Sequence, residues 1–449
     1  MNHKLTTILP FAAILCAAGC ATVDRARDAQ EGRSVLDGER VLSFAETGLS
    51  ATNGPVAVAD LEEVALRASP SILQARQAVI LAQIAVRDVK SSYIPTLDAA
   101  AGYTYTAAKV SKEAGSTHDG AFGGQASLNM LVYDFGRTRA SARRAVNALV
   151  SAERDVRTAE NASRYAVRRA CYALRRSEEL RDVAAEKAAV YAEHRRQMQE
   201  RYDAGAVNSY AVTKAGVDWS QAVLEAVTAS NAVRTARAGL NLALGLADAP
   251  DFAIADSGIR TFGGLGVEDL VEIARTNAPA LASLRAAAQG ASDFVDYTVA
   301  DLYPSLGVSI QYQGTYDDST LLWNLVGAGQ LSQHIFCAGR KRRAIDAAVA
   351  QLRIARAAVA AEELSLRNQI TTAVLDSVRA SQQLGVAIET RKMAEENYRI
   401  VSQSYDVGKA SELERSDAQV ALSAAKAAVV TAKYDYYDSQ ILVSRLIGE

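Results

Sequence analysis

The chain has 449 residues and a formal net charge of −2, with 22% charged residues, so its composition provides no basic surface that would require a nucleic acid partner. Hydrophobic residues make up 49% of the chain, but Ala dominates them, and 18 Tyr supply most of the aromatic area. Only 7 Pro are present, which suits long uninterrupted helices.

The N-terminal residues have the pattern of a secretory leader. A short charged start is followed by an apolar run over residues 5–15 and by small residues, which predicts a signal peptide over residues 1–19. The small pair before Cys20 resembles the bacterial lipobox, whose Cys carries a covalent lipid such as palmitate, although Ala17 stands where that motif usually has Leu. Ala21 is not the Asp that tends to retain lipoproteins at the inner membrane. The alternative is an ordinary cleaved leader in which Cys20 is incidental.

Residues that could carry chemistry are sparse. Cys171 and Cys337 have no CxxC spacing, so they indicate neither a zinc site nor a disulfide framework, and we expect both in the core. No glycine-rich loop has a phosphate-binding context, and after the leader no 18-residue apolar run predicts a transmembrane helix. We therefore expect no catalytic residue, no metal site and no cofactor other than a lipid on Cys20. The scattered histidines are His3, His118, His194 and His334.

The mature chain begins with a predicted extended segment over residues 20–58, which is polar and contains Gly and Pro. Asp60 has the pattern of an N-cap for a helix that continues to about Ser92. Pro70 divides this helix, so we expect two segments that meet near residues 68–69.

A change of period from 3.6 to 2 predicts a β-hairpin over about residues 94–133. Apolar residues alternate with polar or small ones on both sides of a Gly- and Ser-rich loop over residues 109–124. Each strand would have roughly ten residues, about what a membrane-crossing strand needs. The apolar positions are Leu97, Ala99, Ala101, Tyr103, Tyr105, Ala126, Leu128, Met130 and Val132.

A helical pattern over residues 137–200 gives a rod of about 95 Å at 1.5 Å per residue. This length is typical of a coiled coil or a helical tube. A tip over residues 202–208 reverses the chain into a return helix over residues 209–245. Charged residues such as Arg168 and Glu179 are expected on solvated faces. Steps of seven place a small apolar seam at Leu149, Ala152, Val156, Ala159, Ser163, Ala166, Ala170, Ala173, Ser177 and Leu180.

The second half repeats the first. Pro304 matches Pro95 at an offset of 209 residues, and Gly339 matches Gly136 at an offset of 203, because the second hairpin loop is six residues shorter. A length difference confined to this loop supports the hairpin, since loop tips tolerate insertion. The predicted divisions are a first repeat over 59–245, a connector over 246–265 and a second repeat over 266–449. Within the second repeat we expect a β-hairpin over about 304–336, a long helix over 340–403, a tip over 405–410 and a return helix over 411–447.

The two tips contain the same short motif. Tyr202 and Gly205 in the first copy match Tyr405 and Gly408 in the second, each 203 residues apart. Gly at this place lets the backbone take a positive φ and reverse direction. We therefore predict two long helical hairpins that end in equivalent turns.

Four amphipathic strands cannot stand in a bilayer alone, because an open sheet leaves unpaired backbone groups at its edges. A secretory leader and two such hairpins therefore favour a barrel that several copies share. Rods of this length favour a structure that crosses an aqueous compartment.

The duplicated plan, the motif Tyr-Asp-Phe-Gly-Arg at residues 133–137 and the two tip motifs resemble the TolC family of outer-membrane efflux and secretion channels over nearly all of residues 60–449. The resemblance implies an α+β membrane protein with an internal two-fold repeat. It implies a homotrimer whose 12-stranded β-barrel, four strands per chain, is continuous with a long periplasmic α-helical barrel. It also implies a lipid-anchored protein at the outer membrane that extends into the periplasm.

The function implied by the resemblance is a passive exit duct, with a periplasmic adaptor docking at the tip turns and an inner-membrane pump supplying energy. Efflux of small molecules is favoured because a lipobox Cys such as Cys20 is typical of family members that work with proton-driven drug or metal pumps. One alternative is the outer-membrane channel of a type I protein secretion system. Another, from a different class, is a lipidated periplasmic adaptor or scaffold.

The resemblance also implies a gate just after the second tip. Tyr405, Glu414 and Asp417 fall on positions that match the family's gating Tyr and its two acidic rings. Three chains would place six carboxylates around one constriction and attract cations. Ala410 and Ala211 stand where the family has the Arg and the Asp of an ionic latch, so that latch is missing or rewired. The alternative is that Glu414 and Asp417 are ordinary exposed charges.

Overall fold

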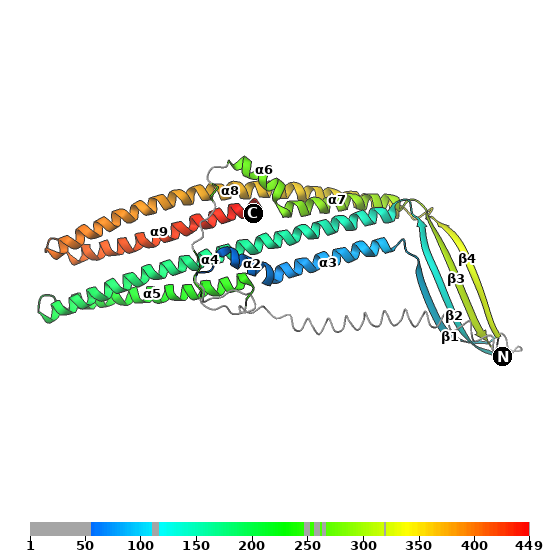
Figure 1. Ribbon diagram of the computed structural model, residues 1–449, viewed down its shortest axis with the longest axis horizontal. Coiled ribbons are helices and arrows are strands. Elements are labelled where there is room, and N and C mark those ends of the chain that lie inside the picture. Colours follow the sequence, from blue (N-terminus) through cyan, green and yellow to red (C-terminus); the bar gives the residue numbers. More distant parts are fainter. Residues whose placement is uncertain are drawn as a thin grey trace.

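The computed structural model describes residues 55–109, 116–246, 252–255, 261–262, 266–317 and 320–448. The predicted signal peptide, Cys20 and most of the N-terminal segment lie outside these residues, as does much of the connector. The described chain is elongated, with a sheet at one end and two helical hairpin tips at the other (Figure 1). Its elements are α2 (Val58–Ala68), α3 (Pro70–Ser91), β1 (Thr96–Lys109), β2 (Ser116–Tyr133), α4 (Arg137–Asp203), α5 (Ser209–Leu244), α6 (Val267–Asn277), α7 (Pro279–Ala300), β3 (Ser305–Asp317), β4 (Thr320–Ser332), α8 (Arg340–Asp406) and α9 (Glu412–Leu446).

The internal repeat is present element for element. Helices α2 to α5 correspond to α6 to α9, and the long helices α4 and α8 have 67 residues each, or about 100 Å. Helices α3 and α7 have 22 residues each and both begin with Pro at the first position, where its missing N–H costs nothing. The start of α2 differs from the prediction, because the helix begins at Val58 and places Asp60 inside its first turn rather than at the cap.

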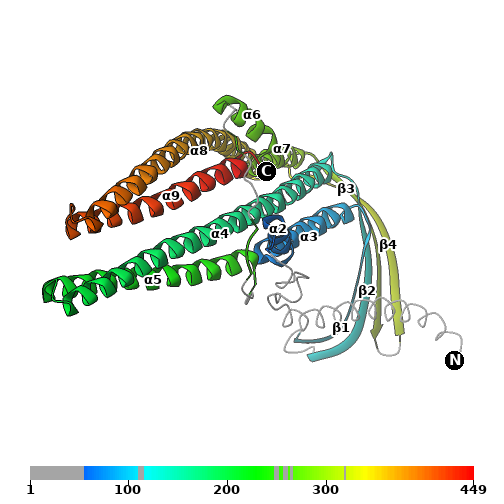
Figure 2. The same cartoon turned by 60° about the vertical axis from the view of Figure 1, so that its left-hand side comes forward.

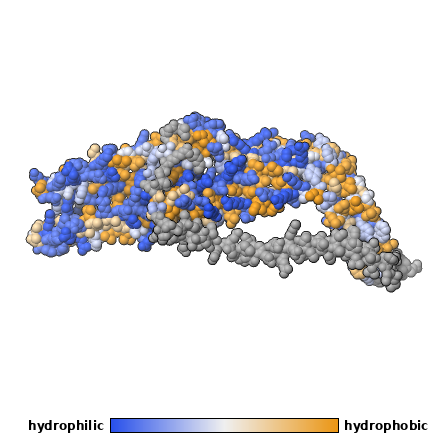
Figure 3. Space-filling model, viewed as in Figure 1, coloured by the Kyte–Doolittle hydropathy of each residue, from blue (hydrophilic) through white to orange (hydrophobic). Residues whose placement is uncertain are grey.

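The four strands form one antiparallel sheet in the order β1-β2-β3-β4, and Figure 2 shows it curving away from the helices. Directly paired residues share a face, so the register shows what each face presents. One row contains Tyr103, Phe122, Tyr316 and Leu321 across all four strands. A row on the opposite face contains Gln125, Gln313 and Asn324. The sheet therefore has one hydrophobic and one polar face, and hydrophobic residues cover much of its surface in Figure 3.

The strands are longer than the roughly ten residues predicted. They have 14, 18, 13 and 13 residues. Residues 116–124, predicted as loop, belong to β2 because the small Gly and Ser residues there pair with β1. Conversely, β4 ends at Ser332 rather than near residue 336, and Ile335 and Phe336 are 96% and 88% exposed beyond it.

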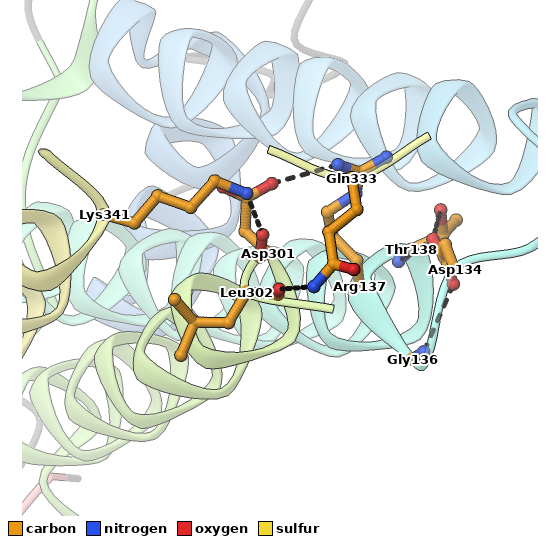
Figure 4. A network of polar contacts seen from close by, with 8 residues as sticks. All are labelled: Asp134, Gly136, Arg137, Thr138, Asp301, Leu302, Gln333 and Lys341. Atoms are coloured by element: carbon orange, nitrogen blue, oxygen red, sulfur yellow. Dashed lines mark hydrogen bonds and ion pairs between the residues drawn. The ribbon is translucent and has the colours of Figure 1, made fainter. Parts of the chain in front are cut away.

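The junction between sheet and helices differs between the repeats. In the first repeat the Asp134 side chain is buried and accepts hydrogen bonds from the backbone N–H of Gly136 (3.2 Å) and of Thr138 (2.6 Å), and from the Thr138 hydroxyl (Figure 4). These bonds satisfy the first amides of α4. In the second repeat Cys337 occupies the equivalent position, and it is partly exposed rather than in the core as predicted.

Ion pairs also fasten this junction. Asp301, at the end of α7, pairs with Arg137 of α4 at 3.0 Å and with Lys341 of α8 at 3.2 Å (Figure 4). Burial by itself would raise the pKa of Asp301, but the hydrogen bonds and charges of Arg137 and Lys341 outweigh it and lower the pKa. One carboxylate thus ties three helices together where the sheet begins.

Small core clusters lie where the short helices α2 and α6 pack against the long ones. In the first, Leu61 and Ala65 of α2 meet Val167 and Cys171 of α4. Cys171 is fully buried as predicted, and burial raises the pKa of its thiol to about 12. Among the described residues, no helix is long and apolar enough to cross a bilayer.

The predicted seam of α4 is wrong in its middle part. Ala166 and Ala173 are exposed, whereas Val167, Cys171 and Leu174 are buried. The buried positions are three or four residues apart and follow the 3.6-residue period of a straight helix, which drifts away from a strict seven-residue repeat. In α8, the predicted positions Ile345, Ala348, Leu352, Ala355, Val359 and Leu366 are all buried or half-buried.

The expectation that the helix charges are merely solvated is also wrong for several residues. Arg168 of α4 binds Glu62 of α2 through Nε at 2.5 Å. Glu179 of α4 accepts from Lys433 at 2.9 Å and from the Tyr434 hydroxyl at 2.6 Å, both on α9. The first pair fixes α2 on α4 within the first repeat, and the contacts of Glu179 join α4 to α9 and so help to align the two hairpins.

Candidate functional site

The two hairpin tips have the same backbone geometry. Gly205 and Gly408 have φ of 72° and 76°. In the first tip the N–H of Ala206 donates to the carbonyl of Arg201 at 2.8 Å, and in the second the N–H of Lys409 donates to that of Ser404 at 2.8 Å. These bonds are those of a Schellman motif, which satisfies the last carbonyls of a helix and needs a left-handed residue. The predicted tip turns are confirmed.

The return helices are capped differently. Asn208 accepts from the N–H of Ala211 at 3.2 Å at the start of α5. At the start of α9, Ser411 and Glu414 form a capping box, in which Glu414 accepts from the Ser411 N–H at 2.6 Å. The hydrogen bonds from Ser411 lower the pKa of Glu414. The candidate gate residue Glu414 therefore also holds the helix start, while Asp417 lies exposed three residues on.

Tyr405 joins the tips of the two hairpins. Its hydroxyl accepts a hydrogen bond from Arg201 Nη1 at 2.6 Å, which joins the end of α8 to the end of α4. The guanidinium of Arg415 lies over its ring, 4.3 Å from the centroid. Burial raises the pKa of Tyr405, and a hydrogen bond to Glu412 raises it further, so the phenol stays neutral. Two arginines therefore contact the Tyr405 side chain, Arg201 at its hydroxyl and Arg415 over its ring.

A second layer of contacts supports this tyrosine. His194 of α4 contacts Glu412 through Nε2 at 2.7 Å and Arg415 through Nδ1. Because a guanidinium only donates, Nδ1 is the acceptor in the contact with Arg415, and Nε2 is the donor to Glu412. Burial would raise the pKa of Glu412, but the hydrogen bonds from His194 and Tyr405 lower it. We call the five residues Arg201, His194, Tyr405, Glu412 and Arg415 the tip cluster.

A cavity of about 440 Å³ lies beside the tip cluster, between α4, α8 and α9. Its lining includes Tyr191, Tyr398 and Gln419 together with members of the cluster. Within the described part of the chain, no group of three His, Cys, Asp or Glu side chains could hold a metal ion.

Tyr405 was predicted from the sequence, but the residues that contact it were not. Tyr202 was predicted as its equivalent in the first tip, but Tyr202 is 44% exposed and lies outside the tip cluster. Two signals pointed to the missed residues. His194 and Arg201 lie seven apart on α4, and Glu412 and Arg415 lie three apart on α9, so each pair shares one helix face.

Two equivalent helical hairpins, each built on a helix about 100 Å long and continuous with a four-stranded antiparallel sheet that is hydrophobic on one face, define the subunit of an outer-membrane channel. The sequence pattern of the family described as outer membrane efflux protein matches residues 61–246 and 270–449. The chain belongs to this family, and the prediction of a TolC-type protein is confirmed.

Solved structures share the fold. The Campylobacter jejuni CmeC outer membrane channel has a TM-score of 0.76 and 17% identity, covering 87% of this chain and 85% of that one. The outer membrane protein VceC from Vibrio cholerae has a TM-score of 0.72 and 18% identity, covering 87% and 95%. The open state of the Neisseria gonorrhoeae MtrE outer membrane channel has a TM-score of 0.72 and 16% identity, covering 87% and 88%. A search of curated proteins found no match.

Proposed function

We propose that this chain forms the passive exit duct of a tripartite efflux system that exports small molecules. The main support for this proposal is the sheet, whose hydrophobic and polar faces suit a barrel wall between lipid and a water-filled lumen. Its edge strands β1 and β4 require partners in hydrocarbon, so three copies would close a 12-stranded barrel. The family places the protein in the outer membrane, and the long helices would carry the lumen through the periplasm.

The partners follow from this arrangement. A periplasmic adaptor would dock on the tip turns around Tyr202, Gly205, Tyr405 and Gly408, and an inner-membrane pump would supply the energy. A lipid on Cys20 would anchor the N-terminus, and replacing Cys20 with Ser would then abolish labelling by a fatty acid analogue. Labelling that persists in this variant would contradict the anchor. Membership of a channel family removes the alternative of a periplasmic adaptor.

Deletion of the gene tests the transport assignment. We expect higher cellular accumulation of dyes or antibiotics and recovery on expression of the wild-type chain. Unchanged accumulation together with lost export of a secreted protein would instead favour a type I secretion channel. Heat-resistant trimers in the outer-membrane fraction would support the assembly, and a monomer there would contradict it.

The gate is proposed at the second tip. Tyr405 would hold the hairpins together, and Glu414 with Asp417 would form acidic rings around the constriction. Ala410 and Ala211 stand where the family has the Arg and the Asp of its ionic latch. The contact of Arg201 with Tyr405 would replace that latch in this protein.

The acidic rings can be tested by replacing Glu414 and Asp417 with Ala together. We expect higher single-channel conductance and weaker block by multivalent cations, since six carboxylates would be lost from three chains. Because Glu414 also caps α9, Glu414→Gln with Asp417→Asn serves as a second variant that keeps hydrogen-bonding groups in place. If neither variant changes conductance or block, these residues are ordinary surface charges.

A further inference from the structure

A cavity of about 450 Å³ lies where the sheet meets the helices of the second repeat. The end of α7, the start of β3, the end of β4 and the start of α8 contribute to its lining, and Arg137 at the start of α4 completes it. Figure 4 shows part of this junction from close by. A volume of this order is typical of cavities that bind small molecules. The residues that fasten the junction therefore also surround a space that could hold a small ligand.

The cavity lies on the polar face of the sheet. Ser305 and Ser332 line it and pair directly with each other across β3 and β4. They share a face with the polar pair of Gln313 and Asn324, because the positions on each strand are an even number of residues apart. In the proposed barrel this face borders the lumen, so a solute that crosses the barrel passes the cavity.

Positive charge exceeds negative charge in this cavity. Three cationic side chains line it, those of Arg137, Arg340 and Lys341, and Asp301 is the one carboxylate among the described lining residues. Arg137 and Lys341 already share Asp301, at 3.0 Å and 3.2 Å (Figure 4). Arg340 is exposed and has no ion pair within the described part of the chain, and the first turn of α8 contains no acidic residue. Because a cleft with an excess of one charge concentrates ions of the opposite sign, this cavity favours an anion.

The first repeat forms an equivalent cavity without the charges. Its volume is about 400 Å³, and its lining includes Ser92 and Thr96, which match Asp301 and Ser305 at the offset of 209 residues. None of the described residues that line it is charged. The fold therefore forms a cavity at this place with neutral residues alone, and the excess of positive charge is a property of the second repeat.

We propose that this cavity binds the anionic group, a carboxylate, sulfonate or phosphate, of small molecules that pass through the lumen. Arg340 supplies the charge that no carboxylate neutralises, and a guanidinium can bind such a group through two N–H donors. Arg137 and Lys341 hold Asp301 and add positive charge around the anion, and rings of Arg or Lys favour anions in pores. This assignment rests on the proposed exit duct and gives it organic anions as a substrate class.

The candidate acidic rings at the tips do not cancel this site. They lie beyond the far end of α8, whose 67 residues span about 100 Å. Charges in physiological salt are screened over about 8 Å, so each site acts on a solute independently of the other. Variants of the cavity and variants of the gate therefore report on different steps of the passage.

Titration calorimetry on the purified full-length protein in detergent tests the site with naphthalenedisulfonate, a small organic dianion. The wild-type chain should bind it saturably, and Arg340→Gln should weaken binding about tenfold, because it removes a charge-assisted hydrogen bond. Arg342→Gln is the matched control, since Arg342 is exposed in the same turn of α8 but does not line the cavity, and it should bind as the wild type does. Absence of binding to the wild type, or equal losses in the two variants, would overturn the site.

Single-channel recording tests whether the anion binds in the lumen. In bilayers of neutral phosphatidylcholine, naphthalenedisulfonate added on the barrel side should reduce the wild-type current, and Arg340→Gln should need about tenfold more of it for the same reduction. Binding that leaves the current unchanged would place the anion outside the lumen and overturn the proposal. Phosphatidylglycerol that co-purifies with the wild type but not with Arg340→Gln would also overturn it, because a lipid phosphate would then be the occupant. Wild-type channels that conduct without block would leave the exit duct standing, whereas a wild-type protein that forms no channels would overturn the duct itself.

Discussion

Replacing Tyr405 with Phe removes a single hydroxyl where the two hairpins meet. In the wild-type protein this hydroxyl accepts a hydrogen bond from Arg201 of the first hairpin at 2.6 Å and donates one to Glu412 of its own hairpin. Only the bond from Arg201 joins the hairpins, and the contact of Arg415 with the ring is kept in the variant. Hydrogen bonds to charged groups contribute about 1.5–3 kcal/mol, but solvent screens this exposed one, so we assign it about 1 kcal/mol.

The consequence for a channel depends on the number of copies that open together. If three chains open as one unit, the loss amounts to about 3 kcal/mol, or roughly a hundredfold in the ratio of open to closed channels. Single-channel recording of the purified protein in planar lipid bilayers measures this ratio. We expect a large rise in open probability for Tyr405→Phe.

Tyr202→Phe is the matched control, because Tyr202 occupies the equivalent position in the first tip and lies outside the tip cluster. It should behave as the wild-type protein. Equal open probabilities for Tyr405→Phe and Tyr202→Phe would refute the reasoning that Arg201 and Tyr405 hold the tips together.

Four further predictions concern stability and pH. Asp134→Ala should lower the free energy of unfolding by about 1–2 kcal/mol in urea titrations, since it removes the buried cap of α4, and an unchanged midpoint would contradict this. Gly245→Ala should destabilise by more than 1 kcal/mol, because φ is 73° and its Cβ would be 2.9 Å from the last carbonyl of α2. Gly216→Ala, inside α5 with open space around it, should raise the free energy of unfolding by about 0.5–1 kcal/mol. Urea titrations measure both glycine variants, and a lower free energy of unfolding for Gly216→Ala would contradict this account. The pKa of Glu412 is lowered from 4.5, so its contribution is complete above pH 4.5 and is lost as pH falls through the lowered value. Conductance should therefore rise in acid in the wild-type channel but not in Glu412→Gln, and identical pH profiles would exclude this role.

The elements themselves could be predicted because local rules determine them. Pro70 and Pro279 set the starts of two helices, and Gly205 and Gly408 set the turns, since few other residues tolerate these backbone positions. Two offsets that differ by six residues were enough to locate the length difference in a hairpin loop. The strand ends were less accurate, because Gly- and Ser-rich residues 116–124 pair with β1 only when that strand is in place.

The sequence by itself therefore determined the repeat, the order of the elements and the amphipathic strands, because these depend on spacing along the chain. Only the tertiary structure decided which face of α4 is buried, since a straight helix drifts from a seven-residue period. It also decided that Arg201 meets Tyr405, residues 204 positions apart, because their contact depends on how two long hairpins lie side by side.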